Sequence, residues 1–412
     1  MNKIAVMGHG VVGSGVVEVF YKNHDSILTK AGADMDIKYI LDLREFPETP
    51  YADKFIKDFK VIVKDPEVNI VVETMGGLEP AYTFVKQCLE AGKSVVSSNK
   101  ELVAQKGFEL LSIAKEKNVN FLFEASVGGG IPIIRPISQC LAANDITEIA
   151  GILNGTTNFI LTKIFKDKMD FEKALSLAQS LGYAERDPSA DVLGFDSCRK
   201  ICILAALAFG KHVYPDQVHT EGITEITLAD VLYAGSFCSA VKLIGRAKKL
   251  TDGRILATVY PAIVSRDSQL SSVDDVFNAV MVRGDATGDV VFYGKGAGKL
   301  PTASAVMADV IDCVKHVAAR KYLSWDDYTE GYVADYTEDT LALYVCAETK
   351  TAEAKEHIKT KLSGVKFLAR ENQPESEIAF VTGIDSEKNL RQAMNELSDV
   401  ITVKNTIRVL DI

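Results

Sequence analysis

The chain has few cysteines, and they are scattered along it. Its seven cysteines are scattered over 412 residues without a Cys-x-x-Cys motif. This pattern excludes a dense disulfide framework and a cysteine zinc site, and it is typical of a reducing compartment. No apolar run approaches the roughly 18 residues of a membrane-spanning helix, and no secretory signal precedes the first expected strand. We therefore expect a cytoplasmic protein that does not bind membranes.

Positive charges are outnumbered by negative ones. The chain has 46 Lys and Arg against 56 Asp and Glu, a net charge of -10. Such a chain repels nucleic acid unless it carries a local basic patch, and the sequence offers none. Hydrophobic residues make up 47% of the chain, enough to build real cores, and the length predicts two or three domains.

The first third of the chain alternates short apolar runs with helical segments. The expected strands are residues 4–7, 36–41, 69–72, 94–97 and 120–124. The expected helices are residues 13–23, 80–91 and 107–117. This alternation predicts an α/β fold, a Rossmann-type doubly wound parallel sheet with helices on both faces. We assign it to residues 1–132, with a returning helix at about 303–322.

The rest of the chain has a different pattern. Residues 133–302 mix helical periodicity with strand-like runs, which predicts an α+β catalytic and dimerisation domain. Residues 321–340 are polar and aromatic and resemble a linker. The tail, 341–412, has the expected order strand–helix–strand–strand–helix–strand. That order predicts a small ferredoxin-like domain.

A glycine fingerprint follows the first expected strand. Gly8, Gly10 and Gly13 form Gly-x-Gly-x-x-Gly and open a helix, the context in which a dinucleotide pyrophosphate binds. At the end of the second strand, Asp42 suits the ribose hydroxyl of NAD, and Arg44 suits the 2′-phosphate of NADP. The residues leave both nucleotides open.

Three further loops follow strands. The loops 73–77 and 97–101 stand at carboxyl ends of strands, where ligands bind in such sheets, so Lys100 should face the site. The loop 124–132 contains three consecutive glycines. Their carbonyls suit a hard cation and their freedom suits a hinge; from the residues alone we favour the hinge.

The segment 182–200 has the densest set of chemically active side chains. Three carboxylates, Glu185, Asp187 and Asp191, share one loop, and Asp196 and Lys200 are four residues apart on an expected helix that is apolar nearly all round. An exposed pair would contribute only about 0.3–0.5 kcal/mol and carry no function. At the start of a buried helix, the carboxylates can bind an ammonium group while the lysine meets a reacting oxygen.

Together these motifs resemble the homoserine dehydrogenase family over roughly residues 1–320. The matching segments, in the family's order, are ETMGG, SSNKELV, EASVGGGIPIIRP, GILNGTTNFIL, GYAERDPSADVLGFDSCRK and GKGAGKLPTASAV. The resemblance implies interconversion of L-homoserine and L-aspartate 4-semialdehyde with NADP or NAD, in threonine, methionine and isoleucine biosynthesis. It also implies a homodimer or higher homo-oligomer.

The resemblance assigns roles by position. Lys200 matches the proton donor to the substrate oxygen, and Lys100 a second lysine near nicotinamide and substrate. Glu185 and Asp196 match substrate-binding carboxylates, with Asp191 in support. The cofactor contacts, with the fingerprint, are Gly8, His9, Gly10, Val11, Val12, Gly13, Arg44, Thr74, Lys100 and Gly298. A sodium ion is implied at the mainly main-chain oxygens of Glu124, Val127, Gly129 and Ile131; this replaces the hinge interpretation.

The tail resembles an ACT domain, a fold that senses small molecules, which implies an amino-acid effector. Its first loop reads Ala347–Lys350, without the usual acidic–Pro–Gly turn, so the resemblance leaves threonine as the effector open.

In the oxidising direction Lys200 must accept a proton, so we expect homoserine oxidation to need alkaline pH. Two alternatives remain. An aspartate-semialdehyde dehydrogenase needs a nucleophilic cysteine in a strand-end loop, where this chain has none. A non-catalytic nucleotide sensor would bind nucleotide without turnover, and it has no need of a proton donor.

Overall fold

The computed structural model describes residues 1–316 and 323–412, which form two compact units. The first unit contains residues 1–145, 202–215 and 292–329; the second contains residues 146–201, 216–291 and 330–412. The division into three domains at 132, 302 and 341 stays a prediction. The end of the expected helix at 303–322 lies outside the described residues from 317 onward.

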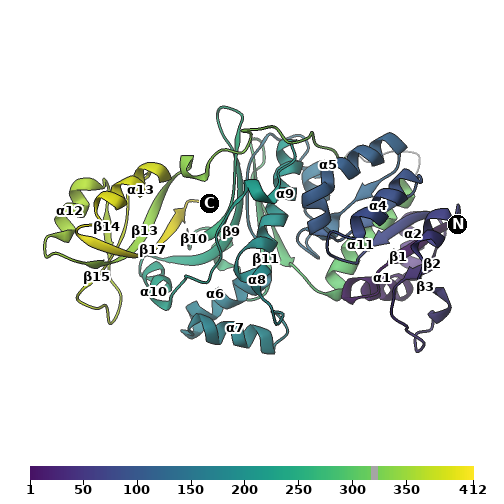
Figure 1. The fold of residues 1–412 in the computed structure, drawn as a ribbon, viewed down its shortest axis with the longest axis horizontal. Coiled ribbons are helices and arrows are strands. Elements are labelled where there is room, and N and C mark those ends of the chain that lie inside the picture. The colour runs from purple at the N-terminus through teal and green to yellow at the C-terminus, as the bar shows by residue number, and fades with distance from the viewer. Residues whose placement is uncertain (317–322) are drawn as a thin grey trace. The chain divides into compact units, whose positions relative to one another are not determined.

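A parallel sheet forms the centre of the first unit (Figure 1). Its strand order is β3-β2-β1-β4-β5-β6, and every neighbouring pair is parallel. The strands are β1 (Asn2–Met7), β2 (Met35–Leu41), β3 (Phe55–Ile56), β4 (Val68–Glu73), β5 (Ser94–Ser97) and β6 (Phe121–Leu122). This order confirms the expected Rossmann-type sheet. The sequence missed β3, because two residues carry no detectable alternation.

Helices cover this sheet and complete its core. They are α1 (Val11–Lys22), α2 (His24–Ala31), α3 (Phe59–Lys64), α4 (Ala81–Glu90), α5 (Lys100–Lys117) and α11 (Lys299–Lys315). The late helix α11 packs against α1, as expected, and its apolar side chains share one core with those of β1 and β4. A Cβ on Gly15 of α1 would lie 2.8 Å from the carbonyl oxygen of Lys299, so this close helix contact requires glycine.

A mixed sheet forms the core of the second unit. Its order is β12-β11-β7-β9-β10-β17-β13-β15-β14, with β8 on β10 and β16 on β13. The strands before the tail are β7 (Ile146–Ile152), β8 (His219–Thr220), β9 (Ser239–Lys249), β10 (Ile255–Ser265), β11 (Phe277–Gly284) and β12 (Gly288–Lys295). The helices are α6 (Gly155–Asp167), α7 (Phe171–Ser180), α8 (Ser189–Val192), α9 (Phe195–Phe209, which runs on into the first unit) and α10 (Leu228–Ser236). The α+β expectation is confirmed.

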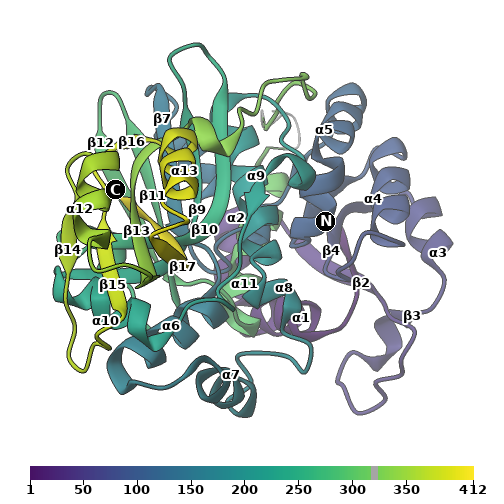
Figure 2. The ribbon, with the colours of Figure 1, turned by 60° about the vertical axis from the view of Figure 1, so that its left-hand side comes forward.

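The tail has the expected ferredoxin-like order. Its elements are β13 (Thr340–Thr349), α12 (Ala354–Lys361), β14 (Lys366–Leu368), β15 (Glu377–Val381), β16 (Asp385–Ser386), α13 (Glu387–Glu396) and β17 (Ile401–Leu410). Its strands are antiparallel in the order β17-β13-β15-β14. In addition, β17 lies between β13 and β10 (Figure 2) and pairs with β10 in parallel, Arg408 opposite Ala262. The tail therefore shares a sheet and a hydrophobic core with the segment before it.

The segment expected as a linker is partly packed. Trp325 is buried, and its indole N–H donates to Nδ1 of His212 over 2.9 Å. Further on, Val333 forms a bridge with Ile255. Among the described residues, no helix is both long and apolar enough to cross a membrane.

Candidate active site and nucleotide site

The glycine fingerprint forms a tight turn between β1 and α1. Gly8 has a φ of +93°, and a Cβ on Gly13 would lie 1.9 Å from the carbonyl oxygen of Gly8. Gly10 caps α1 without a side-chain hydrogen bond, and Val11 is 69% exposed. The first N–H groups of the helix are thus open to an anionic ligand, as a pyrophosphate site requires.

Asp42, directly after the end of β2, is hydrogen-bonded to the fingerprint turn. It accepts the backbone N–H of His9 over 2.8 Å, and the guanidinium of Arg44 donates to both of its oxygens over 3.0 and 2.8 Å. These bonds from Arg44 hold the pKa of Asp42 well below its usual range. The His9 ring is buried edge-on against Phe46 and Phe55, and this burial lowers its pKa. His9 is therefore neutral near pH 7.

Thr74 and Glu73 form hydrogen bonds that join the carboxyl ends of neighbouring strands. The Thr74 hydroxyl lies 3.1 Å from the carbonyl oxygen of Met7 and 3.0 Å from that of Gly8, and it can donate to either. Glu73, fully buried, accepts from the Ser97 hydroxyl over 2.6 Å and from the backbone N–H of Met75 over 2.8 Å. Burial raises the pKa of Glu73. Glu73 was not among the predicted site residues, although a carboxylate at the end of an apolar strand was a usable signal.

Lys100 lies in a helix, which corrects the expected loop 97–101 and the expected helix start at 107. Asn99 caps α5: its side-chain oxygen accepts the backbone N–H of Leu102 over 3.1 Å, and its amide donates to the carbonyl of Gly77 over 2.6 Å. An asparagine before a run of good helix formers is an N-cap signal that the sequence analysis overlooked. Lys100 is the first helical residue, directly beyond the end of β5.

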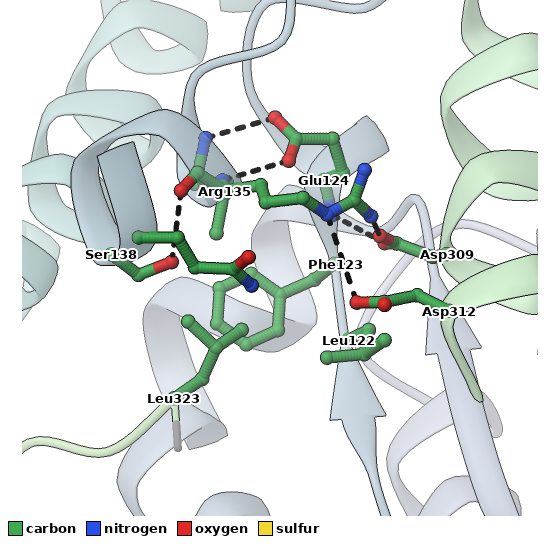
Figure 3. Close-up of a pocket in the computed structure, with 10 residues that line it drawn as sticks. Leu122, Phe123, Glu124, Arg135, Ser138, Asp309, Asp312 and Leu323 are labelled. Atoms are coloured by element: carbon green, nitrogen blue, oxygen red, sulfur yellow. Dashed lines mark hydrogen bonds and ion pairs between the residues drawn. The ribbon is translucent and has the colours of Figure 1, made fainter. Parts of the chain in front are cut away.

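Hydrogen bonds of Glu124 fix the expected sodium loop, and Figure 3 draws the one from Arg135 among them. Its carboxylate accepts the backbone N–H groups of Ile133, Ile134 and Arg135 over 2.6, 2.8 and 2.8 Å. Its own N–H donates to Asp309 over 2.8 Å, and the Arg135 guanidinium also bonds Asp309. Burial, with the nearby charge of Glu124, raises the pKa of Asp309 to about 8. Glu124, Ile134, Arg135 and Asp309 line a pocket of about 280 Å³.

The three glycines allow close backbone packing. A Cβ on Gly129 would lie 2.4 Å from the carbonyl oxygen of Gly296, and the N–H of Gly130 donates to the carbonyl of Lys295 over 3.1 Å. Gly298, at a φ of +130°, is the N-cap residue of α11. Within the described residues, no hydrogen bond reaches the carbonyl oxygens of Val127, Gly129 or Ile131. Such carbonyls suit a hard cation.

In the second unit, Lys200 and Asp196 form a buried pair at the start of α9. Lys200 Nζ donates to Oδ2 of Asp196 over 2.7 Å and to the carbonyl of Leu153 over 2.6 Å; the two side chains are 10% and 9% exposed. Asn154 Nδ2 donates to Asp196 over 2.9 Å and to Asp191 over 2.7 Å. The structure thus brings Lys200, Asp196 and Asp191 together.

Asn154 is a site residue that the sequence analysis missed. Its Oδ1 accepts the backbone N–H of Thr157 over 2.8 Å, so one side chain caps α6 and orients two carboxylates. The signal was an Asn-Gly-Thr-Thr cap directly after an apolar strand.

The other two carboxylates of the acidic loop, Glu185 and Asp187, differ from Asp191 in their contacts. Glu185 is exposed; in the described structure its backbone carbonyl accepts from Gln179, and no bond joins its carboxylate to the Lys200 pair. Asp187 accepts the hydroxyl and backbone N–H of Ser189, a local turn.

A parallel sheet of this order, a glycine fingerprint and a buried lysine–carboxylate pair define a nicotinamide-nucleotide-dependent dehydrogenase. Two family models match the chain: "Homoserine dehydrogenase" over residues 132–311 and "Homoserine dehydrogenase, NAD binding domain" over residues 8–124. Homoserine dehydrogenase of Bacillus subtilis is 36% identical, over 99% of this chain and 98% of its own. That of Synechocystis is 44% identical, over 76% of this chain and 73% of its own.

Solved structures agree. A homoserine dehydrogenase from Thiobacillus denitrificans superposes with a TM-score of 0.90 at 34% identity, over 100% of this chain and 98% of its own. A hyperthermophilic archaeal homoserine dehydrogenase in complex with NADPH has a TM-score of 0.64 at 29% identity, over 76% of this chain and 97% of its own. The chain belongs to the homoserine dehydrogenase family. It is an NAD(P)-dependent oxidoreductase that interconverts L-homoserine and L-aspartate 4-semialdehyde, and the two alternative functions are set aside.

Proposed function

We propose that Lys200 is the proton donor and acceptor of this reaction. The observation that carries the proposal is its burial at one end of an apolar helix, bonded to Asp196 and to a main-chain carbonyl. When aspartate semialdehyde accepts hydride at its aldehyde carbon, negative charge develops on the oxygen. A lysine ammonium held in this position stabilises that charge and delivers the proton. In reverse it accepts the proton of the alcohol, which favours oxidation at alkaline pH.

Asp196, Asp191 and Glu185 are proposed to bind the amino-alcohol substrate. Asn154 holds Asp191 and Asp196 by one amide group, so both carboxylates are oriented before substrate arrives. Oriented acceptors suit an ammonium group. Glu185, on the exposed loop that follows α7, supplies a third carboxylate when substrate is bound.

The nucleotide is proposed to lie on the fingerprint turn. Its contacts would be Gly8 to Gly13, Thr74, Lys100 and Gly298, with Lys100 near the nicotinamide. Arg44 is 62% exposed on its side chain and covers the carboxylate of Asp42. This arrangement favours the 2′-phosphate of NADP, although NAD remains a substrate to test.

A sodium ion is proposed at the main-chain oxygens of Glu124, Val127, Gly129 and Ile131. The open carbonyls of the last three support it. Side-chain clusters that could hold a metal are absent from the described residues, so main-chain oxygens are the donors to consider. When bound, the ion would supply positive charge that orders the loop.

We also propose a cytoplasmic homodimer, or a higher homo-oligomer, with an amino-acid effector bound at the tail.

The test compares two buried lysines of the second unit. Lys242 resembles Lys200: it is 3% exposed, bonds a main-chain carbonyl and pairs with Asp274. Lys200→Met and Lys242→Met remove the charge and keep an apolar stem. Turnover of L-homoserine, followed by absorbance of the reduced cofactor at alkaline pH, should fall at least ~100-fold in Lys200→Met. Nucleotide binding and the melting temperature are measured for both.

We expect Lys242→Met, where it folds, to retain turnover. Turnover near the wild-type rate in a folded Lys200→Met would overturn the assignment.

A further inference from the structure

Arg408, on the last strand of the chain, is a buried cation bound by two carboxylates. It is 2% exposed. Its Nη1 and Nη2 donate to Glu221 over 2.7 and 2.9 Å, and its Nε and Nη2 donate to Glu387 over 2.8 and 2.7 Å. The guanidinium also lies 4.2 Å from the ring centroid of Tyr260. All three nitrogens of the planar guanidinium donate, and the single ammonium group of a lysine could not reproduce this arrangement.

One of these carboxylates belongs to the tail helix. Glu387, fully buried, is the first residue of α13, and its backbone N–H donates to the carbonyl of Asp339 over 2.8 Å. Arg408 itself is held by strand pairing, opposite Ala262 of β10 and Leu343 of β13. This end of the network is therefore a fixed anchor.

The other carboxylate belongs to a loop that leads toward the candidate site. Glu221 follows β8, and its N–H donates to the carbonyl of Val259 over 2.7 Å. Two residues on, the N–H of Ile223 donates to the carbonyl of Val192 over 2.8 Å. A Cβ on Gly222 would lie 2.2 Å from that same oxygen, so the two backbones touch without intervening side chains.

The backbone that receives this contact carries the substrate carboxylates. Val192 and Gly194 lie between Asp191 and Asp196 in the sequence. Gly194 has a φ of +84°, and a Cβ there would lie 3.1 Å from the carbonyl oxygen of Glu221. A shift of the Glu221 loop must therefore move the turn that sets both carboxylates, because close-packed backbone transmits displacement.

We propose that Arg408 is a positioning residue for Asp191 and Asp196, so that the tail completes the substrate site. The inference rests on the proposed roles of those two carboxylates. Arg408 touches neither of them; it acts through Glu221 and the contact between residues 222 and 192. Without the fork, Glu221 loses the paired hydrogen bonds that connect it to the fixed anchor at Glu387, and the Glu221 loop shifts.

The test uses Arg408→Lys and Glu221→Gln in the full chain. Each should raise the KM for L-homoserine about tenfold and leave the KM for the nucleotide within about twofold. The readout separates positioning from mere stability, because partial unfolding lowers the active fraction and kcat without changing KM. The double variant should resemble either single variant, since both remove the same connection.

Arg370→Lys is the matched control. Arg370 also lies in the tail and donates by Nε and Nη2 to one carboxylate, Glu377, and among the described residues none of its hydrogen bonds or ion pairs reaches the Glu221 loop. Its substitution should leave the KM for L-homoserine unchanged. An unchanged KM in folded Arg408→Lys and Glu221→Gln, or an equal rise in Arg370→Lys, would overturn the inference.

Asp196→Asn, measured in parallel, distinguishes a failure of the proposed function from a failure of the role of Arg408. Normal turnover and KM in Asp196→Asn would refute the proposed function, and the inference with it. Impaired turnover in Asp196→Asn beside an unchanged KM in Arg408→Lys would refute the inference alone.

Discussion

Lys200 Nζ lies 2.7 Å from Oδ2 of Asp196, one turn earlier on the same helix. Both side chains are buried, where desolvation offsets most of the attraction between the two charges. Stability therefore gives little reason for the pair. A catalytic role does, because a buried lysine beside a carboxylate is held in one orientation and can exchange a proton with a bound substrate oxygen.

Asp196→Asn should therefore lower turnover by about 100-fold, because it removes the charge that orients Lys200 while keeping the shape of the side chain. The amide of the variant lies beside Asn154, whose Nδ2 donates to Asp196 in the wild-type chain. Steady-state kinetics with L-homoserine checks the prediction, and nucleotide binding by fluorescence serves as the control. Near-normal kcat together with a near-normal KM for L-homoserine would show that Asp196 neither orients Lys200 nor binds substrate.

Arg44→Ala should raise the KM for NADP about tenfold and leave the KM for NAD almost unchanged, since one charge-assisted contact to the 2′-phosphate is lost. Lys57→Ala is a suitable control, because Lys57 is a surface cation paired with Glu45. The measurement is a pair of KM values at fixed L-homoserine. Equal changes for the two nucleotides would mean that Arg44 does not contact the phosphate.

Glu221 gives a prediction for stability against pH. Burial opposes ionisation, but hydrogen bonds from His219 and Arg408 outweigh it and lower the pKa of Glu221 from 4.5 to about 2. A carboxylate with a lowered folded-state pKa stabilises the fold above pH 4.5, and the contribution is lost as pH falls toward 2. The full shift corresponds to roughly 3 kcal/mol, which solvent screening at a side chain 36% exposed reduces to about 1–2 kcal/mol.

Urea unfolding of wild type and Glu221→Gln checks this. Below pH 5.5 the difference between their free energies of unfolding should shrink, and by pH 3 it should fall to about half of its value at pH 5.5. A difference that grows on acidification would reverse the sign and contradict the assignment.

Glu124→Ala should cost about 3 kcal/mol or more of folding free energy, because two buried backbone N–H groups and one part-buried N–H group lose their acceptor. Glu109→Ala, at a half-exposed carboxylate paired with Lys86, should cost less than about 1 kcal/mol. Chemical denaturation measures both. Similar costs for the two variants would mean that the loop 124–135 does not depend on Glu124.

Much of the molecule was predictable where the signal is local. Apolar runs followed by turns predicted the strands β1, β2, β4 and β5, and the glycine fingerprint predicted the first turn. The i,i+4 spacing of Asp196 and Lys200 predicted a pair on one helix face. Asn99 and Asn154 were missed because an N-cap is a single residue, read only when the start of the helix is known.

The sequence by itself determined the Rossmann-type sheet, the order of the tail and the family, since these follow from hydrophobic period, glycine placement and ordered motifs. Only the tertiary structure decided that β17 joins the tail to β10, that Asn154 orients two carboxylates, and that Arg408 links Glu387 to the loop beside Val192. Those are contacts between residues far apart in the chain. Their geometry is set by packing, which no local pattern of residues encodes.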